Sequence, residues 1–291
     1  AIAKNFSIDS NRIILGSGSD EVLLFAALAF CQDGDEILHA NHGFEMYSIV
    51  SKVVGAVPKK IKEDVNFNLN IENLIDQTND ATKVIYIASP NNPTGTYLSR
   101  DQLVKLMNSI SKNIIVVIDG AYVEYVQKDD YDKGFSLTDE YENIILTRTF
   151  SKTYGLAALR VGWCYTSQKI ADIINKIKPP FNTTTISQSL AIKALEDKEH
   201  IENSVKLNSE IKDWFEKELK LLNIKTRQTE GNFTLIETSE EEAEKISNHL
   251  MNDGIIIRRL NSYNLPNFLR ISIGTKEEMN LTVESLKKFN V

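Results

Sequence analysis

The sequence has few cysteines, no long hydrophobic run and no excess of positive charge. Cys31 and Cys164 are the only cysteines in 291 residues, too few for a disulfide framework, which favours a reducing compartment such as the cytoplasm. The longest apolar run, Val22–Cys31, has ten residues, whereas a membrane span needs about 20. Lysine and arginine total 33 against 40 acidic residues, a net charge of −7. We therefore expect no nucleic-acid partner and no membrane.

What is present is typical of a globular protein. Hydrophobic residues make up 42% and charged residues 25%, both ordinary values for a folded domain. At roughly 150 residues per domain, the length predicts about two domains. The four histidines are scattered, with no carboxylate or cysteine at metal-ligand spacing, so no metal site is predicted.

The first part of the chain alternates apolar runs with amphipathic segments. Such alternation predicts βαβ units. The runs at 85–88 and 114–118 are continuously apolar, as in strands buried on both faces. We therefore predict an α/β fold with a mostly parallel sheet in three α/β/α layers over residues 1–175. The predicted strands are Glu36–His39, Lys83–Ala88, Ile114–Ile118, Asn143–Leu146 and Val161–Tyr165, and the helices are Ser19–Cys31, Phe44–Val54, Ser99–Ser111 and Gln168–Leu195.

The pattern changes after this region and predicts a smaller C-terminal α+β domain over residues 176–291. A long helix around 168–196 is expected to connect the two domains. The predicted elements are helices Ile201–Leu222, Glu240–Met251 and Lys276–Phe289 and strands Phe233–Glu237, Ile255–Ile257 and Phe268–Ile273.

Polar groups follow several predicted strands, where ligands bind in open α/β sheets. A small-residue turn, Gly16–Glu21, leads into a helix and could approach a phosphate, although taken alone the segment is more often an ordinary capped turn. Asp119 ends a buried strand, where a carboxylate is costly unless a cation or donor pairs with it. Thr149, Ser151 and Arg160 suit a phosphate, and Lys152 among them could be a nucleophile.

Taken in this order, the motifs resemble those of the fold-type I aminotransferases, which use pyridoxal 5′-phosphate (PLP). The resemblance covers essentially the whole chain. It is carried by Ser89–Gly95, by Asp119-x-x-Tyr122, and by Ser151-Lys152 with Arg160 eight positions further on. Within the family, histidinol-phosphate aminotransferases are the most similar, on the segments Ile13–Glu21, Phe44–Tyr47, Gly254–Arg258 and Tyr263–Thr275.

The resemblance implies how these residues would act. Lys152 would bind PLP covalently and move the proton at the substrate Cα. Asp119 would pair with the pyridine nitrogen, which supplies the cation that this carboxylate needs. Phe44 would stack on the ring, and Asn92 and Tyr122 would bind its oxygen. The other implied cofactor contacts are Gly18, Ser19, Asp20, Thr149, Ser151 and Arg160.

The resemblance also implies the reaction and the assembly. A homodimer would convert histidinol phosphate and 2-oxoglutarate to imidazole acetol phosphate and glutamate, a step of histidine biosynthesis. Arg270 would bind a substrate anion in a bidentate manner. Asn232 and Arg258 are further substrate-binding candidates, and a surface ion pair is an equal alternative for Arg258.

The sequence departs from the family pattern at three places. Gly120 stands where an acidic residue often follows the aspartate, and His42-Gly43 replaces the usual Pro-Thr. The chain also begins at what resembles the family's following helix, so we expect that the N-terminal arm, which closes over the substrate, is missing.

Other activities are compatible with the same residues. An aromatic or other amino-acid aminotransferase and a decarboxylase of phosphorylated amino acids would keep the cofactor and change the substrate. An inactive PLP-binding remnant is the alternative of another class. A dinucleotide-binding oxidoreductase is disfavoured, because Glu21 replaces the third glycine of that motif.

Overall fold

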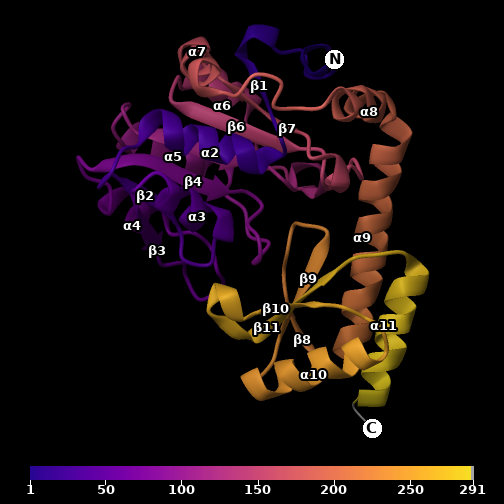
Figure 1. The fold of residues 1–291 in the computed structure, drawn as a ribbon. Coiled ribbons are helices and arrows are strands. Elements are labelled where there is room, and N and C mark those ends of the chain that lie inside the picture. Colours follow the sequence, from indigo (N-terminus) through magenta and orange to yellow (C-terminus); the bar gives the residue numbers. More distant parts are fainter. Residues whose placement is uncertain (290–291) are drawn as a thin grey trace.

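Residues 1–289, which a computed structural model describes, form two β-sheets joined by a long helix (Figure 1). The first sheet has seven strands in the order β1-β7-β6-β5-β4-β2-β3, and the second has four in the order β10-β11-β9-β8. Among the described helices, none combines the length and apolar character that a membrane span requires.

The seven-stranded sheet is mostly parallel, as predicted. Strands β3, β2, β4, β5 and β6 run parallel, whereas β7 pairs antiparallel with both β6 and β1. Only a short 3₁₀ helix, Ala157–Leu159, separates β6 from β7, so the chain returns without the crossover that a parallel strand needs. The strands are β1 Ile13–Gly16, β2 Glu36–Ala40, β3 Val57–Ile61, β4 Thr82–Ala88, β5 Ile115–Asp119, β6 Ile144–Thr149 and β7 Gly162–Thr166.

Helices cover both faces of this sheet. On one face are α2 (Ser19–Phe30), α3 (Glu45–Val53) and α7 (Gln168–Ile177), and on the other are α4 (Ile71–Asp76), α5 (Arg100–Ser109) and α6 (Phe135–Glu140). Alternate residues of β5 enter the two cores: Ile115 and Val117 pack with α2 and α3, and Val116 and Ile118 pack with α5. This is the two-residue period of a strand buried on both sides.

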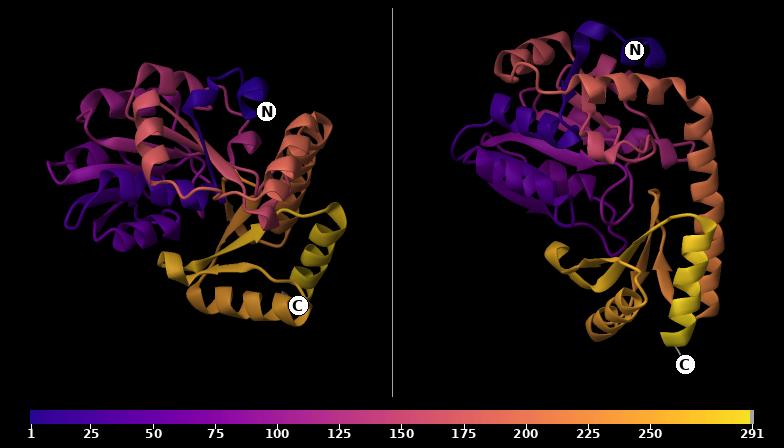
Figure 2. Two further views of the ribbon diagram at one scale, coloured as in Figure 1. Left: turned by 45° about the horizontal axis from the view of Figure 1, so that its top comes forward. Right: turned by 45° about the vertical axis from the view of Figure 1, so that its right-hand side comes forward.

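The four-stranded sheet is antiparallel, which agrees with the predicted C-terminal α+β part. Its core joins the sheet to α9, α10 and α11. In Figures 1 and 2, α9 leads from the side of the first sheet down to the second. The elements of this part are α9 Lys198–Leu221, β8 Lys225–Arg227, β9 Phe233–Glu237, α10 Glu240–Asn252, β10 Arg258–Leu260, β11 Leu265–Ser272 and α11 Lys276–Phe289. Near the N-terminus, α1 (Ile2–Phe6) packs against α8 (Thr185–Glu196).

Two predicted elements differ from the structure. The prediction of one continuous helix over 168–196 is wrong: α7 ends at Ile177 and α8 begins at Thr185. Pro179 and Pro180 lie between them, and proline interrupts the helical hydrogen bonds. The strand predicted at 255–257 is displaced to β10, because pairing with β11 begins at Arg258, opposite Arg270.

Candidate active site

The two-residue period of the parallel strands places side chains from three neighbouring strand ends on one face of the sheet. Ala88, Asp119 and Thr147 are register partners at the carboxyl ends of β4, β5 and β6. They face the same side as Ile115 and Val117, toward α2 and α3.

Asp119 is buried and accepts hydrogen bonds from two hydroxyl groups. The residue is 4% exposed. Thr147 Oγ1 donates to Oδ1 and the Tyr47 hydroxyl donates to Oδ2, both at 2.9 Å. Burial raises the pKa of Asp119, while the two donors oppose that rise. Both hydrogen-bond partners are neutral and no cation of the described residues forms an ion pair with the carboxylate, so a cationic ligand group would complement it.

The N-terminus of α2 and Arg160 form a second cluster next to it. Gly18 is the N-cap of α2, with φ 82°, and a Cβ there would lie 2.5 Å from Arg160 Nη2. Arg160 Nη2 donates to Asp20 Oδ2 at 3.2 Å, and Nη1 lies 3.4 Å from Ser151 Oγ. The Ser151 N–H in turn donates to Thr149 Oγ1 at 3.1 Å. Helix N–H groups, hydroxyls and a guanidinium together favour an anion such as phosphate.

A cavity of about 210 Å³ connects these two groups. Lys152 borders it and is exposed, with its Nζ 5.2 Å from the centroid of the Tyr122 ring. Ten of the eleven predicted cofactor residues line this cavity: Ser19, Asp20, Phe44, Asn92, Asp119, Tyr122, Thr149, Ser151, Lys152 and Arg160. Gly18, the eleventh, is not one of the lining residues but lies next to Arg160, which is.

The four-stranded sheet contributes two arginines to the same region. Arg270 on β11 donates to Asn92 Oδ1 and lies over the Phe233 ring, 5.1 Å from its centroid. Arg258 is its register partner on β10, 53% exposed in its side chain, and lies 3.9 Å from Glu45 at the start of α3. Asn232 is adjacent in sequence to Phe233, whose ring contacts Tyr122 edge-on.

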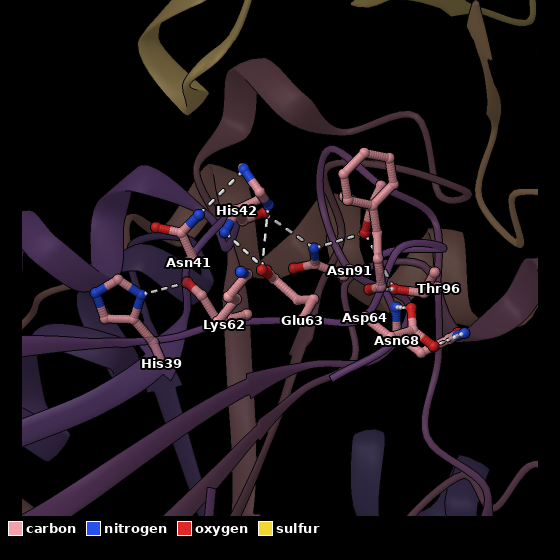
Figure 3. Close-up of polar contacts among 12 residues, drawn as sticks. His39, Asn41, His42, Lys62, Glu63, Asp64, Asn68, Asn91 and Thr96 are labelled. Atoms are coloured by element: carbon pink, nitrogen blue, oxygen red, sulfur yellow. Dashed lines mark hydrogen bonds and ion pairs between the residues drawn. The ribbon is translucent and has the colours of Figure 1, made fainter. Parts of the chain in front are cut away.

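A polar network supports the loop that precedes Phe44 (Figure 3). Glu63, 8% exposed, accepts hydrogen bonds from His42 N at 2.8 Å and from His42 Nδ1 at 3.1 Å. Asn91 Nδ2 donates to His42 O at 3.0 Å. The network therefore joins the loop that holds Phe44 to the turn that holds Asn92.

Sequence reasoning overlooked Tyr47. Tyr47 was named only as the end of the segment Phe44–Tyr47 and had no predicted role, yet its hydroxyl donates a hydrogen bond to Asp119. Its distance from Phe44, three residues along a predicted helix, was a usable signal, because residues three apart lie on one helix face.

The structure also gives a reason for glycine at position 120. Arg148 is 3% exposed, lies on the opposite face of β6 from Thr147 and donates to Thr147 O and Lys133 O. A Cβ at Gly120 would meet Arg148 Nη1 at 2.0 Å, so a larger residue would displace this guanidinium.

The chemistry of the cavity fits PLP. Asp119 is a buried acceptor for a protonated ring nitrogen, the cluster around Arg160 suits a phosphate, and Lys152 supplies a primary amine at the same cavity. Phe44 supplies an aromatic ring.

Comparisons with known proteins agree with this chemistry. Residues 1–286 match the family described as aminotransferase class I and II. The chain is 38% identical over 290 residues to a histidinol-phosphate aminotransferase of Dinoroseobacter shibae, covering 99% of this chain and 80% of that protein. It is 40% identical over 293 residues to one of Pelagibacter ubique, covering 99% and 81%.

A solved structure supports the same assignment at the level of the fold. Histidinol-phosphate aminotransferase from Sinorhizobium meliloti, in complex with pyridoxal 5′-phosphate, aligns with a TM-score of 0.92 at 23% identity, covering 99% of this chain and 80% of that one. From the family match and the identity over nearly its whole length, this chain belongs to the class I and II aminotransferases.

Proposed function

We propose that this protein is a PLP-dependent histidinol-phosphate aminotransferase, which transfers an amino group between histidinol phosphate and 2-oxoglutarate. The observation that carries the proposal is the 38–40% identity to histidinol-phosphate aminotransferases over 99% of the chain. The cavity that gathers Lys152, Asp119 and Arg160 supports it independently.

The residues around the cavity have distinct tasks toward the cofactor. PLP, when bound, supplies an electron sink for the charge that develops at the substrate Cα. Asp119 would accept the ring N–H, and Phe44 would supply an aromatic face for the ring. Lys152 would hold the cofactor through its amine and carry the proton at the substrate Cα. Asn92 and Tyr122 would bind the ring oxygen. The α2 N-terminus, Thr149, Ser151 and Arg160 would bind the phosphate.

Arg270 and Arg258 provide the positive charge that the two substrates need. Histidinol phosphate bears a phosphate and 2-oxoglutarate bears two carboxylates, so each presents an anion away from its reacting carbon. The Nε of Arg270 is buried and has no hydrogen-bond partner among the described residues, which leaves a donor for such an anion. Asn232, next to Phe233, is a further candidate on this side of the cavity.

The decisive experiment compares substrates and cofactor binding. With PLP added, we expect a visible absorbance band that borohydride abolishes and that the Lys152→Ala variant does not form. We also expect kcat/KM for histidinol phosphate to exceed that for phenylalanine. A preference for phenylalanine would overturn the substrate assignment, and a wild-type protein without the band would overturn the cofactor assignment.

We also propose that the protein is a cytoplasmic homodimer. Its two cysteines are free, which suits a reducing compartment.

Large apolar side chains are exposed at α8 and just before it: Phe181 at 97%, Ile186 at 68% and Leu190 at 44%. Such a patch favours burial against a second copy. Analytical ultracentrifugation should give a dimer for wild type and for the control Leu221→Ser, and a monomer for Phe181→Ser combined with Ile186→Ser. A monomeric wild type would refute the proposal.

A further inference from the structure

Each carboxylate oxygen of Asp119 receives one hydrogen bond from the protein. Thr147 binds Oδ1 and Tyr47 binds Oδ2, both at 2.9 Å and both away from water. Because a carboxylate oxygen can accept about two hydrogen bonds, the side chain retains capacity for a ligand. Where the free lone pairs of Asp119 point depends on how firmly the two hydroxyl donors hold the carboxylate.

Tyr47 is held by its neighbours. It is 1% exposed, and its ring stacks on that of Tyr86 at 4.9 Å with an interplanar angle of 4°. The Tyr86 hydroxyl is anchored by donating to Leu23 O on α2 at 2.7 Å. Phe44 packs edge-on against Tyr47, with ring centroids 5.8 Å apart. Tyr47 therefore contacts both the proposed stacking residue, Phe44, and the proposed partner of the ring nitrogen, Asp119.

We propose that Tyr47 is a positioning residue that fixes Asp119 as an ionised acceptor for the pyridine nitrogen. This inference rests on the proposed function, since it requires PLP in the cavity. A tyrosine with a purely structural role needs only its ring, and phenylalanine would stack on Tyr86 equally well. What the hydroxyl adds is a donor to Asp119.

The charges around Asp119 explain why a donor is needed. Burial raises the pKa of Asp119, and the nearby Asp20 carboxylate raises it further, whereas the Tyr47 and Thr147 hydroxyls and the Arg148 guanidinium lower it. Burial also raises the pKa of Tyr47 well above its usual value, so Tyr47 keeps its proton. The hydrogen bond from Tyr47 consequently stabilises the charged form of Asp119.

The test measures PLP binding to the apo-protein as a function of pH. Tyr47→Phe should weaken binding about tenfold at neutral pH, the size expected for one buried hydrogen bond to a charged group. It should also move to higher pH the midpoint below which affinity is lost, because Asp119 without this donor takes up a proton more readily.

Tyr86→Phe is the matched control. It removes a buried hydroxyl from the same stack, but that hydroxyl binds Leu23 O and not Asp119. We expect the wild-type midpoint in Tyr86→Phe. In an Asp119→Asn background, Tyr47→Phe should produce no further shift. An unchanged midpoint in Tyr47→Phe, or an equal shift in Tyr86→Phe, overturns the proposal.

Two further measurements distinguish failure of the proposal from a folding defect and from a wrong substrate assignment. If circular dichroism shows that Tyr47→Phe does not fold, Thr147→Val removes the donor to the other oxygen and should shift the midpoint in the same direction. An unchanged midpoint there would show that hydroxyl donors do not hold the charge, which also overturns the proposal. Turnover of histidinol phosphate by wild type is measured separately. PLP binding without turnover contradicts the proposed substrate and leaves the midpoint comparison valid, whereas absence of PLP binding contradicts both.

Discussion

Arg270 on β11 donates a hydrogen bond to Asn92 in the turn after β4, and this contact joins the two sheets at the cavity. Other contacts cross the same boundary. The Phe233 ring contacts both Arg270 and Tyr122, and Glu230 N donates to Gly95 O at 2.8 Å. A substrate anion bound by Arg270 would therefore lie next to residues that are proposed to hold the cofactor.

Replacing Arg270 by lysine should impair catalysis without unfolding the protein. Lysine keeps the charge but lacks the planar fork that binds a carboxylate with two parallel hydrogen bonds. We expect kcat/KM for 2-oxoglutarate to fall about 100-fold, close to the 3 kcal/mol upper value for a charged hydrogen bond. Steady-state kinetics measure this.

Arg259→Lys is the control for that substitution. Arg259 is next to Arg258 on β10 and pairs with Glu244 at 3.5 Å. We expect near wild-type kinetics from it. Equal losses in both variants would mean that the fork of Arg270 has no particular role.

Gly18→Ala should weaken PLP binding. The new Cβ would lie 2.5 Å from Arg160 Nη2, and φ at Gly18 is 82°, where alanine is strained. Displacement of Arg160 should lower PLP affinity about tenfold, equivalent to the loss of roughly 1.4 kcal/mol from one charged contact to the phosphate.

Gly34→Ala is the matched control, because φ there is 83° and nothing lies within 4 Å of the added Cβ. It should lower the free energy of unfolding by about 1 kcal/mol and leave PLP affinity unchanged. If Gly34→Ala lowered the affinity as much, backbone strain alone would be the cause.

Asp119→Asn should stabilise the apo-protein at neutral pH. Because burial raises the folded-state pKa of Asp119, this group stabilises the fold fully only below its unfolded pKa of about 3.9. That contribution is lost as pH rises through the folded value. Asparagine carries no charge, so the Tm of the variant should exceed that of wild type by about 2–4 °C for each kcal/mol gained.

The difference in Tm should shrink on acidification. Calorimetry of both apo-proteins over a pH series measures it, and a difference that widens toward low pH would contradict the assigned sign. The same variant should bind PLP more weakly than wild type, since it loses the proposed ion pair with the ring nitrogen. The residue would then be one that costs stability and serves the cofactor.

Glu63→Ala should destabilise the protein and loosen Phe44. It leaves two N–H donors of His42 without their acceptor, at a cost of about 1–3 kcal/mol in the free energy of unfolding. Chemical denaturation measures this cost, and Glu63→Gln should restore part of it. Glu72→Ala, which breaks the exposed ion pair with Lys105, should cost no more than about 1 kcal/mol. Equal costs for Glu63→Ala and Glu72→Ala would show that burial of the His42 contact adds nothing.

Much of the fold was predictable because the signals were local. The apolar runs around β4 and β5 and the helix predicted from Ser99 depend on neighbouring residues, and the structure places strands and a helix there. The interruption between α7 and α8 was equally local, since Pro179 and Pro180 are visible in the sequence. Strand pairing was harder to predict from the sequence, because the position of β10 depends on its register with β11. A division of the chain into domains at residue 175 stays a prediction.

The sequence by itself determined the chemistry available to this protein. Its order of motifs identified a PLP-dependent aminotransferase, and Asp119 at the end of a buried strand indicated a carboxylate that needs a partner. Only the tertiary structure decided which groups meet that carboxylate. Tyr47 lies 72 positions before Asp119 and Thr147 lies 28 positions after it. Thr147 reaches it because adjacent parallel strands end at one edge and alternate residues share one face, whereas Tyr47 reaches it from α3, which packs on that face. Contacts of that kind depend on strand order and register, which no local pattern contains.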